Sequence, residues 1–387
     1  MSITKSYEEI NEKIKTGKVV VATAEEIIPM VQEEGVSKVL EKVDIVTTGT
    51  FGAMCSSGAF LNFGHADPPI RMSKVWLNDV PAYAGIAAVD AYIGATELSE
   101  TKGEEYGGAH VIEELVSGKK IKLKALGTGT DCYPRKEIET WVDLNDLNQA
   151  YLFNPRNAYQ NYSVAVNSSS RAYHTYMGIL LPNFGNATYS TSGELSPLLN
   201  DPEYRTIGIG TRIFLGGGTG YVAWEGTQHN PAQQRDENGL PLASAGTLAV
   251  VGDLREMSSK YLRAGIFHNY GISLYVGIGI PIPLLDEEMV KKVAISNKDL
   301  KTTIYDYGIQ RRSKPALGVV SYADLRSGSI NLDGKQIPTA PLSSLDKARE
   351  IAKELKAWIL SGRFYLTEPV AALPYRDGVK PLDEEVE

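Results

Sequence analysis

Residues 264–282 read AGIFHNYGISLYVGIGIPI, and this glycine-rich, β-branched stretch decides the fold class. Glycines placed among isoleucine and valine are typical of a buried strand that another segment of backbone approaches closely. The uncharged run at 271–285 is too short to span a bilayer as a helix, and it contains Pro281 and Pro283. The stretch therefore predicts β-sheet, and no membrane segment is expected.

Two other segments share this composition. Residues 205–224 read RTIGIGTRIFLGGGTGYVAW and residues 245–254 read AGTLAVVGDL, and both predict further buried strands. The GGGTG motif at 216–220 fits either a tight turn that only glycine can make or a loop that lines a pocket. A phosphate cradle is the third alternative, although the motif lacks the Lys-Ser/Thr of a P-loop and the spacing of a dinucleotide fingerprint.

The first fifty residues alternate between helix and strand. The pairs Ser6–Glu9 and Thr23–Glu26 match the capping-box pattern, in which a hydroxyl and a carboxylate cap the first turn of a helix. We expect β-branched strands after these capping signals, at 18–22 and 44–48. Alternation of this kind is typical of proteins that combine helices and strands in one core.

The rest of the chain has no repeat and no linker-like segment. Near its end, Ser343 with Asp346 predicts the start of an amphipathic helix that Gly362 terminates. We therefore expect a mixed α/β protein, with one large domain of glycine-rich mixed β-sheets and flanking helices. This domain is expected to span 1–375, and the acidic residues 376–387 are expected to form a flexible tail.

The composition limits the function classes. With 387 residues, 43% of them hydrophobic and 22% charged, the chain can bury a large core without disulfide or metal staples. A net charge of -8 argues against nucleic acid as a partner, because phosphate backbones attract basic surfaces. The first residues do not resemble a secretory signal, so we expect a cytoplasmic location. Two cysteines cannot hold an iron–sulfur cluster alone, and no histidines have metal-ligand spacing, so no metal or cofactor is expected on this chain.

One of the two cysteines, Cys132, lies in GTGTDCYPR at 127–135. Pro134 follows it at a position where the first turn of a helix would begin, so the pattern predicts a thiol at a helix N-terminus. Backbone N–H groups there, together with Arg135 and Lys136, would favour the thiolate. The alternative is a buried cysteine that fills space, which is the commoner role of a lone free thiol.

The other cysteine, Cys55, has a similar setting. It follows the β-branched strand at 44–48 and a Gly-Thr pair, within a turn of small residues. Two cysteines in matching polar turns after strands favour a shared function over packing. Since no cation lies near Cys55 in sequence, Cys132 is expected to be the reactive thiol and Cys55 its partner or part of the wall of the site.

Three stretches of the sequence resemble a known family. TTGTFGAMCSSGAFLNFGH, LGTGTDCYPR and GIGTRIFLGGGTGYVAWEGTQHNP are similar to the homocysteine biosynthesis proteins of methanogenic archaea and other anaerobes. The resemblance extends from about Glu8 to about Pro374, and the cysteine motifs are specific to the family. The family is regarded as L-aspartate semialdehyde sulfurtransferase.

The resemblance implies a reaction. A cysteine persulfide would deliver sulfur to the aldehyde of aspartate semialdehyde, and reduction would give homocysteine. The persulfide-bearing cysteine of the family corresponds to Cys132, and its second recurrent cysteine to Cys55. Substrates would be aspartate semialdehyde and sulfide, and the partner a small, separate ferredoxin-like protein with iron–sulfur clusters. Many members carry appended regulatory nucleotide-binding modules that this sequence does not reach, so regulation by that route is not expected.

The proposed chemistry needs polar groups around the thiol. Attack on an aldehyde creates an alkoxide, for which the backbone N–H groups of the GTGT turn and the hydroxyls of Thr128 and Thr130 are candidate donors. A substrate carboxylate favours a bidentate guanidinium, for which Arg135 and Arg212 are candidates. Asp131 opposes thiolate formation at its neighbour, and its part is left open.

Histidine offers the remaining proton chemistry. His65 in NFGHADPP and His229 in WEGTQHNP both lie in loops with glycine or proline, and either could protonate the alkoxide. The non-catalytic alternative is a protein that binds a small metabolite or the iron–sulfur partner and whose cysteines merely pack. The Tyr- and Asn-rich segment at 151–190 favours a subunit interface, and hence a homo-oligomer.

Overall fold

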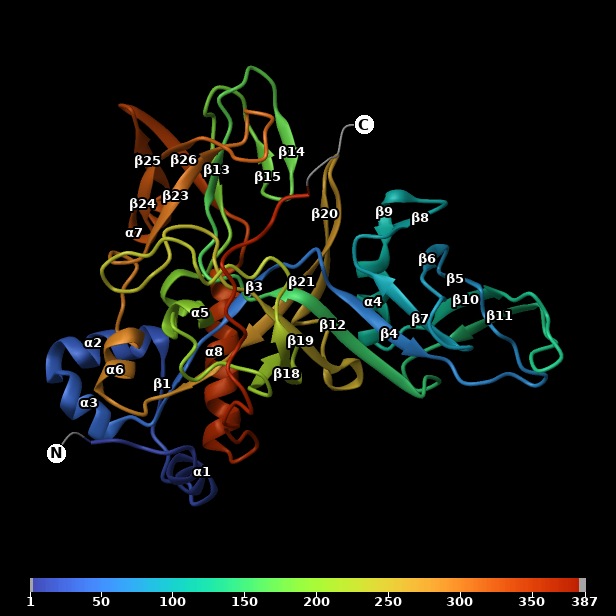
Figure 1. The fold of residues 1–387 in the computed structure, drawn as a ribbon, viewed down its shortest axis with the longest axis horizontal. Helices are drawn as coiled ribbons and strands as arrows, with labels where there is room; N and C mark the ends of the chain where they lie inside the picture. Colours follow the sequence, from blue (N-terminus) through green and yellow to red (C-terminus); the bar gives the residue numbers. More distant parts are fainter. Residues whose placement is uncertain (1–2, 383–387) are drawn as a thin grey trace.

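The computed structural model describes residues 3–382, and its largest sheet lies at the centre of the molecule (Figure 1). All pairings in this sheet are antiparallel, and β3 (Thr50–Ala53) pairs with β21 outside the main path. The main path is β20 (Leu262–Phe267), β21 (Gly271–Gly279), β17 (Arg212–Leu215), β18 (Gly218–Glu225), β19 (Leu248–Asp253), β12 (Gln149–Asn157), β4 (Gly58–Asn62) and β7 (Asp90–Gly94). The glycine-rich segments are therefore strands, as predicted.

The long helix α8 (Leu345–Leu360) packs on the glycines of β21. A Cβ atom added at Gly277 or Gly279 would lie about 3 Å from side-chain atoms of Ile351, since the helix approaches the bare strand. The predicted apolar face of α8 is buried. Its N-cap is Ser344 rather than Ser343, because the Ser344 hydroxyl accepts the hydrogen bond from Lys347 N.

The N-terminal helices begin at the predicted residues. Ser6 starts α1 (Tyr7–Lys15) and Thr23 starts α2 (Ala24–Glu34), and both capping boxes are formed. In a three-stranded sheet, β1 (Val21–Thr23) and β2 (Ile45–Thr47) from this region pair with β22 (Pro281–Pro283), which lies at the end of the glycine-rich segment 264–282. The neighbouring helices are α3 (Val36–Lys42) and α6 (Glu287–Val293).

Two smaller sheets flank the central one (Figure 1). The mixed six-stranded sheet has the order β24 (Ala316–Ser321), β23 (Lys301–Asp306), β13 (Val164–Val166), β16 (Ala187–Tyr189), β26 (Lys335–Pro341) and β25 (Ser329–Leu332). The antiparallel four-stranded sheet, at the right of Figure 1, has the order β11 (Glu137–Val142), β10 (Ile121–Leu126), β5 (Lys74–Leu77) and β6 (Val80–Ala82).

Short elements complete the fold. Two hairpins are formed by β14 (Tyr173–Thr175) with β15 (Gly178–Leu180) and by β8 (Leu98–Ser99) with β9 (Gly103–Gly107). The remaining helices are α4 (Gly108–Val116), α5 (Pro197–Asn200), α7 (Tyr322–Arg326) and the 3₁₀ turns Gly193–Leu195 and Leu254–Glu256. Helices and several sheets of both kinds confirm the mixed α/β class.

The GGGTG motif forms a hairpin turn between β17 and β18. Leu215 pairs with Gly218, so Gly216 and Gly217 are the two turn residues, and their φ angles are 60° and 98°. Positive φ at both central positions is the conformation that favours glycine in two-residue hairpins. The tight-turn prediction is confirmed, and the motif opens no helix that could present N–H groups to a phosphate.

The predicted helix after Cys132 is wrong, because residues 137–142 form strand β11. This strand pairs with β10 along its whole length, from Ile121 opposite Val142 to Leu126 opposite Glu137. Its β-branched and aromatic side chains suit a strand, and the ladder to β10 outweighs the helical signal of Pro134. Cys132 therefore lies in a hairpin loop, not at a helix N-terminus.

Two other predictions concern the C-terminal tail and membrane-spanning segments. Residues 376–382 of the predicted tail form no helix or strand, and residues 383–387 lie outside the described residues. The division at 375 stays a prediction. Between residues 3 and 382, no helix is both long enough and apolar enough to cross a membrane.

Candidate active site

Cys132 lies at the tip of the hairpin that joins β10 to β11. Thr130 N donates to the carbonyl of Tyr133 at 2.9 Å, and Tyr133 N donates back to the carbonyl of Thr130 at 3.1 Å. These bonds leave Asp131 and Cys132 as the two residues of the turn, and the Cys132 side chain is exposed. The thiol is therefore open to a molecule arriving from solvent.

The same loop gathers several predicted site residues. The ring of His65 stacks on Tyr133 with centroids 5.9 Å apart, and Arg135 Nη2 donates to the carbonyl of Asp67 at 2.6 Å. Thr128 and Thr130 are exposed on the loop itself, although the Thr130 N–H already donates within it. The structure thus brings these residues together near Cys132 on an exposed surface, and none of them lines the cavities described below.

Cys55 lies in the turn between β3 and β4 and is half-buried. Its neighbour Ser56 donates to Asn154 Oδ1 at 3.1 Å and to the carbonyl of Arg156 at 3.2 Å. Asn154 Nδ2 in turn donates to Ser57 Oγ at 2.8 Å. The turn that carries Cys55 is therefore fixed against the end of β12.

The surroundings of Cys55 act on its pKa in opposite directions. Burial raises the pKa of the Cys55 thiol, while the nearby Ser273 hydroxyl, the Cys55 backbone and the charge of Arg156 lower it. Ser273 is fully buried, and its hydroxyl has no hydrogen-bond partner among the described residues. Burial raises the pKa of Tyr270 to about 12, and the nearby Cys55 adds to that increase. The surroundings of Cys55 thus include one unpaired hydroxyl and one cation.

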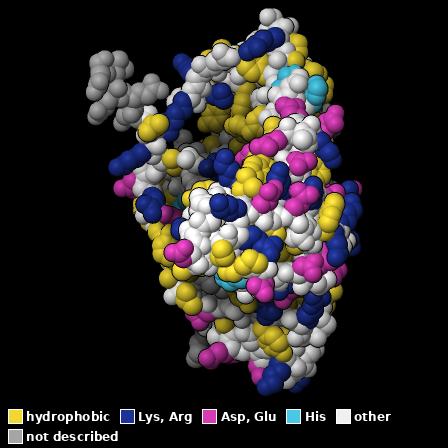
Figure 2. Space-filling model, turned by 90° about the vertical axis from the view of Figure 1, so that its right-hand side faces the viewer, with side chains coloured by type: hydrophobic (Ala, Val, Ile, Leu, Met, Phe, Trp, Pro, Cys, Tyr) yellow, Lys and Arg dark blue, Asp and Glu magenta, His cyan; other side chains and the backbone are white. Residues whose placement is uncertain are grey.

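A cavity of about 590 Å³ is lined by Arg156 and Tyr159, which both lie near Cys55, although Cys55 itself is not a lining residue. Its wall is polar and aromatic, and no Asp or Glu is among the lining residues. Figure 2 shows a hollow in the upper half of one face, with side chains of the class that includes tyrosine on its walls. The tyrosines and cations of the cavity are Tyr159, Tyr162, Tyr176, Tyr305, Tyr307, Arg156, Arg312 and Lys314.

Another cavity, of about 740 Å³, lies beside β24 and β25. Its wall carries Asp324 and Asp333 with Lys301 as its one cation among the described residues, and neither thiol turn contributes to it. A thiol nucleophile with an anionic substrate needs the opposite set of groups. The cavity beside Cys55 is therefore the better candidate for the active site.

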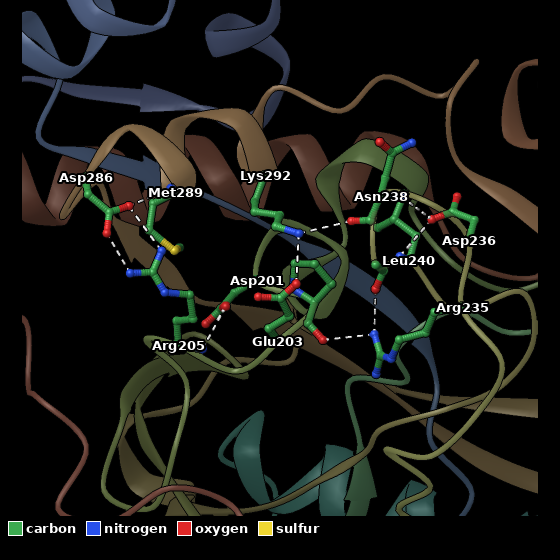
Figure 3. A network of polar contacts seen from close by, with 12 residues as sticks. Asp201, Glu203, Arg205, Arg235, Asp236, Asn238, Leu240, Asp286, Met289 and Lys292 are labelled. Atoms are coloured by element: carbon green, nitrogen blue, oxygen red, sulfur yellow. Dashed lines mark hydrogen bonds and ion pairs between the residues drawn. The ribbon is translucent and has the colours of Figure 1, made fainter.

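A polar network joins α6 to the loop between β18 and β19, where Lys292 donates to the carbonyl of Asn238 at 3.0 Å (Figure 3). Arg235 donates to Gln160 Oε1 at 3.2 Å and to the carbonyl of Gly239 at 2.7 Å, which joins the segment after β12 to the loop before β19. Lys292 on α6 donates to Glu203 Oε1 at 2.9 Å. These contacts hold the loop between β18 and β19, which supplies part of the cavity wall.

The remaining two predicted residues, His229 and Arg212, do not line the cavity. His229 is buried, its Nδ1 lies 3.1 Å from Thr247 N, and burial lowers its pKa. Its sequence neighbours line the cavity, but His229 itself does not. Arg212 lies on β17 with its guanidinium 4.6 Å from the ring centre of Phe364, outside the cavity.

The two cysteine turns lie at opposite ends of strand β4. Cys55 precedes Gly58, whereas His65, which touches the Cys132 loop through Tyr133, follows Asn62. The five residues of β4 rise by about 3.3 Å each, so the turns are separated by roughly 13 Å or more. The structure therefore shows two separate thiol sites, one exposed and one beside a cavity.

Comparison with known proteins places this arrangement in a family. A family model described as homocysteine biosynthesis enzyme, sulfur-incorporation, matches residues 19–366. The chain belongs to this homocysteine biosynthesis family. A relative from Methanosarcina acetivorans, named L-aspartate semialdehyde sulfurtransferase, is 54% identical over 382 residues, covering 99% of this chain and 74% of the relative.

Two other proteins are also similar to this chain. A protein of the same name from Methanocaldococcus jannaschii is 54% identical over 386 residues, covering 96% of this chain and 74% of the relative. An uncharacterized protein from Methanothermobacter thermautotrophicus is 27% identical over 339 residues, covering 85% of this chain and 73% of the relative. No solved structure is significantly similar.

Sequence reasoning did not identify Arg156, Tyr159 or Ser273 in this family member. Arg156 and Tyr159 lie in or just after β12, about 100 residues from Cys55 in the sequence. Ser273 lies in β21, about 220 residues from Cys55. The signal that existed was the Tyr- and Asn-rich segment at 151–190, which supplies three of the five cavity tyrosines. Within residues 3–382, no group of three or more His, Cys, Asp or Glu side chains could hold a metal ion.

The two thiols should differ in reactivity. Iodoacetamide is expected to modify Cys132 well before Cys55 at neutral pH, because Cys132 is exposed while Cys55 is half-buried with a raised pKa. Modification of Cys55 should accelerate as the pH rises through its raised pKa, since the thiolate is the form that reacts. Peptide mass mapping over a pH series measures both rates, with urea-unfolded protein as the control. Equal rates in the folded protein at neutral pH would contradict the assignment, and two inert thiols would favour the non-catalytic alternative.

Proposed function

We propose that this chain incorporates sulfur into L-aspartate semialdehyde and so forms homocysteine. The observation that carries the proposal is 54% identity, over nearly the whole chain, to two proteins named L-aspartate semialdehyde sulfurtransferase. The placement of the thiols supports it, because one cysteine is open to a sulfur donor and the other adjoins a cation-rich cavity. Uptake of sulfur and its delivery are assigned to these two sites.

Sulfur is taken up at Cys132. Its thiolate attacks the outer sulfur of a donor at the persulfide level, the donor's S–S bond breaks, and the donor leaves as a thiolate. The product is a persulfide on Cys132. The exposed position of Cys132 at a hairpin tip supports this role, since the donor need not enter a cavity.

Cys55 then receives the sulfur. The Cys55 thiolate attacks the outer sulfur of the Cys132 persulfide, a new S–S bond forms on Cys55, and Cys132 leaves as a thiolate, with no net change of electrons. The nearby Ser273 hydroxyl and the charge of Arg156 lower the pKa of Cys55 and so favour the attacking thiolate. Because the turns lie at opposite ends of β4, the transfer requires rearrangement of the hairpin loop or the hairpin tip of a second copy of this chain.

The aldehyde reacts in the cavity. The outer sulfur of the Cys55 persulfide attacks the carbonyl carbon, a C–S bond forms, and the oxygen takes up a proton. Burial raises the pKa of Tyr159, which keeps its hydroxyl protonated and able to donate a hydrogen bond to that oxygen. The product is a disulfide between Cys55 and the substrate sulfur, with a hydroxyl on the former aldehyde carbon.

Reduction completes the reaction. Two electrons and two protons cleave the S–S bond to return Cys55 and release a thiohemiacetal, which loses water to give a thioaldehyde. Two further electrons and two protons give homocysteine. This chain has two cysteines, fewer than the thiolates that a cluster takes, so we assign electron delivery to a separate iron–sulfur protein.

A reconstituted assay tests the function. The purified chain is incubated with L-aspartate semialdehyde, polysulfide and a low-potential reductant, and homocysteine is measured by chromatography. We expect homocysteine only when the chain is present. The proposal fails if homocysteine does not exceed the level without protein while the chain is folded and its thiols are reduced.

A further inference from the structure

The cavity beside Cys55 has the charge of an anion site. Three cations and five tyrosines line it, and no Asp or Glu among residues 3–382 does, although the whole chain has a net charge of -8. Lining residues of one sign, in a protein dominated by the other sign, favour a negatively charged ligand. The cavity therefore fits a carboxylate-bearing molecule.

Arg156 is the cation of this cavity that the backbone positions most firmly. The ladder between β12 and β19 is irregular between Asn154 and Asn157, and such a bulge redirects the side chains within it. Asn154 Oδ1 accepts from Arg156 N at 2.8 Å, and Arg156 Nε donates to Thr227 Oγ1 at 3.0 Å. Both the backbone and one edge of the guanidinium are therefore held in place.

The guanidinium of Arg156 has no anionic partner among the described residues. Among residues 3–382, no carboxylate forms an ion pair with it, whereas Arg205 and Arg349 each pair with a carboxylate at 2.6 and 2.9 Å. Arg156 lies beside Tyr159 on the cavity wall, and its guanidinium can form the bidentate contact that a carboxylate favours. A cation on a cavity wall that no described carboxylate neutralises is suited to an incoming anion.

Arg156 is also tied to Cys55. Ser56 donates to the carbonyl of Arg156, and Asn154 joins the same network to Ser57. In aspartate semialdehyde, three C–C bonds of about 1.5 Å separate the carboxylate carbon from the aldehyde carbon, a span of roughly 4 Å. So short a substrate needs its carboxylate anchor next to the thiol. Arg156 meets that condition, because its charge acts on Cys55, and no such effect is found for Arg312 or Lys314.

We propose that the cavity binds a small amino-acid carboxylate and that Arg156 is its anchor, holding the aldehyde of the substrate toward Cys55. The identity of the aldehyde rests on the proposed function, whereas carboxylate binding does not. Arg135, the nearest arginine to Cys132 in sequence, already donates to the carbonyl of Asp67 and lies outside the cavity. The anchor is therefore assigned to a residue on another strand.

Binding of unreactive probes tests the anchor. L-Homoserine has the carbon skeleton of the substrate with an alcohol in place of the aldehyde, and 2-amino-1,4-butanediol lacks its carboxylate. By calorimetry, the wild-type chain should bind homoserine about ten-fold or more tightly than the diol. Arg156→Gln should weaken homoserine binding by about ten-fold or more, and Arg156→Lys should restore only part of it, because lysine cannot form the bidentate contact. Arg171→Gln, at an exposed arginine outside the cavity, is the matched control and should leave binding unchanged.

These experiments distinguish failure of the Arg156 anchor from failure of the proposed function. Homoserine binding that is absent in the wild type, unchanged in Arg156→Gln or no tighter than that of the diol would overturn the anchor. In the reconstituted assay, Arg156→Lys should raise KM for the semialdehyde by about ten-fold while uptake of sulfur on Cys132 stays normal. If homoserine binding depends on Arg156 but no homocysteine forms, the proposed function fails and the anion site remains. If homocysteine forms with an unchanged KM in the variants, the anchor fails and the function remains.

Discussion

Cys132→Ala should reduce homocysteine formation by about a thousand-fold or more, the order expected when a catalytic nucleophile is removed. The variant should also gain no sulfur after polysulfide treatment, because the exposed hairpin tip is the assigned site of sulfur uptake. Intact-mass measurement before and after treatment, with reversal by reductant, checks the first step, and the reconstituted assay checks the whole reaction.

The structure predicts that this variant folds normally. Cys132 is exposed, and the turn that carries it is closed by bonds between Thr130 and Tyr133 that do not involve the thiol. Substitutions at such surface positions usually change the free energy of unfolding by less than about 0.5 kcal/mol. An unchanged melting temperature is therefore the control. Sulfur uptake or homocysteine formation at the wild-type level in Cys132→Ala would remove Cys132 from the mechanism.

Cys55→Ala should take up sulfur on Cys132 normally and yet lose homocysteine formation by a similar factor, about a thousand-fold. The reason is the location of Cys55, which adjoins the cavity and has the Ser273 hydroxyl and the charge of Arg156 beside it. Cys55→Ser keeps a hydrogen-bonding group of similar size and is the second variant.

Two comparisons make the Cys55 result decisive. Wild-type rates in Cys55→Ser would show that the chemistry occurs at Cys132 and that Cys55 only packs. Mixing the Cys132→Ala and Cys55→Ala chains then separates the two routes of transfer. Recovery of homocysteine formation indicates that the hairpin tip of one copy reaches the cavity of another, and no recovery indicates rearrangement of the loop within one chain.

Local signals in the sequence were sufficient for much of the fold. The capping boxes at Ser6 and Thr23 start helices where predicted, because the hydroxyl and carboxylate act within one turn. The glycine-rich segments form strands of the central sheet, where β21 lies against α8. The prediction of a helix at β11 failed because the conformation of this segment depends on pairing with β10. That pairing is a tertiary contact, which the local signal of Pro134 does not indicate.

The residues of the candidate site were likewise predicted only in part. Both cysteines were identified from their turns, and His65, Thr130 and Arg135 do cluster around Cys132. The cavity was not foreseen, because its cation Arg156 comes from a bulge in β12, which is defined by the register of neighbouring strands. A search for the arginine nearest in sequence selects Arg135, whereas the sheet places Arg156 beside Cys55. Which residues face a shared cavity is set by strand order, which local signals in the sequence do not determine.

Sulfur is expected to pass from Cys132 to Cys55 and then to the aldehyde. The most direct measurement loads the wild-type chain with isotopically labelled persulfide sulfur, removes the free donor, and adds L-aspartate semialdehyde with reductant for a single turnover. Peptide mass mapping should find the label on Cys132 and then on Cys55, and chromatography should find it in homocysteine. Label that never reaches Cys55, or homocysteine that forms without label, would contradict the account.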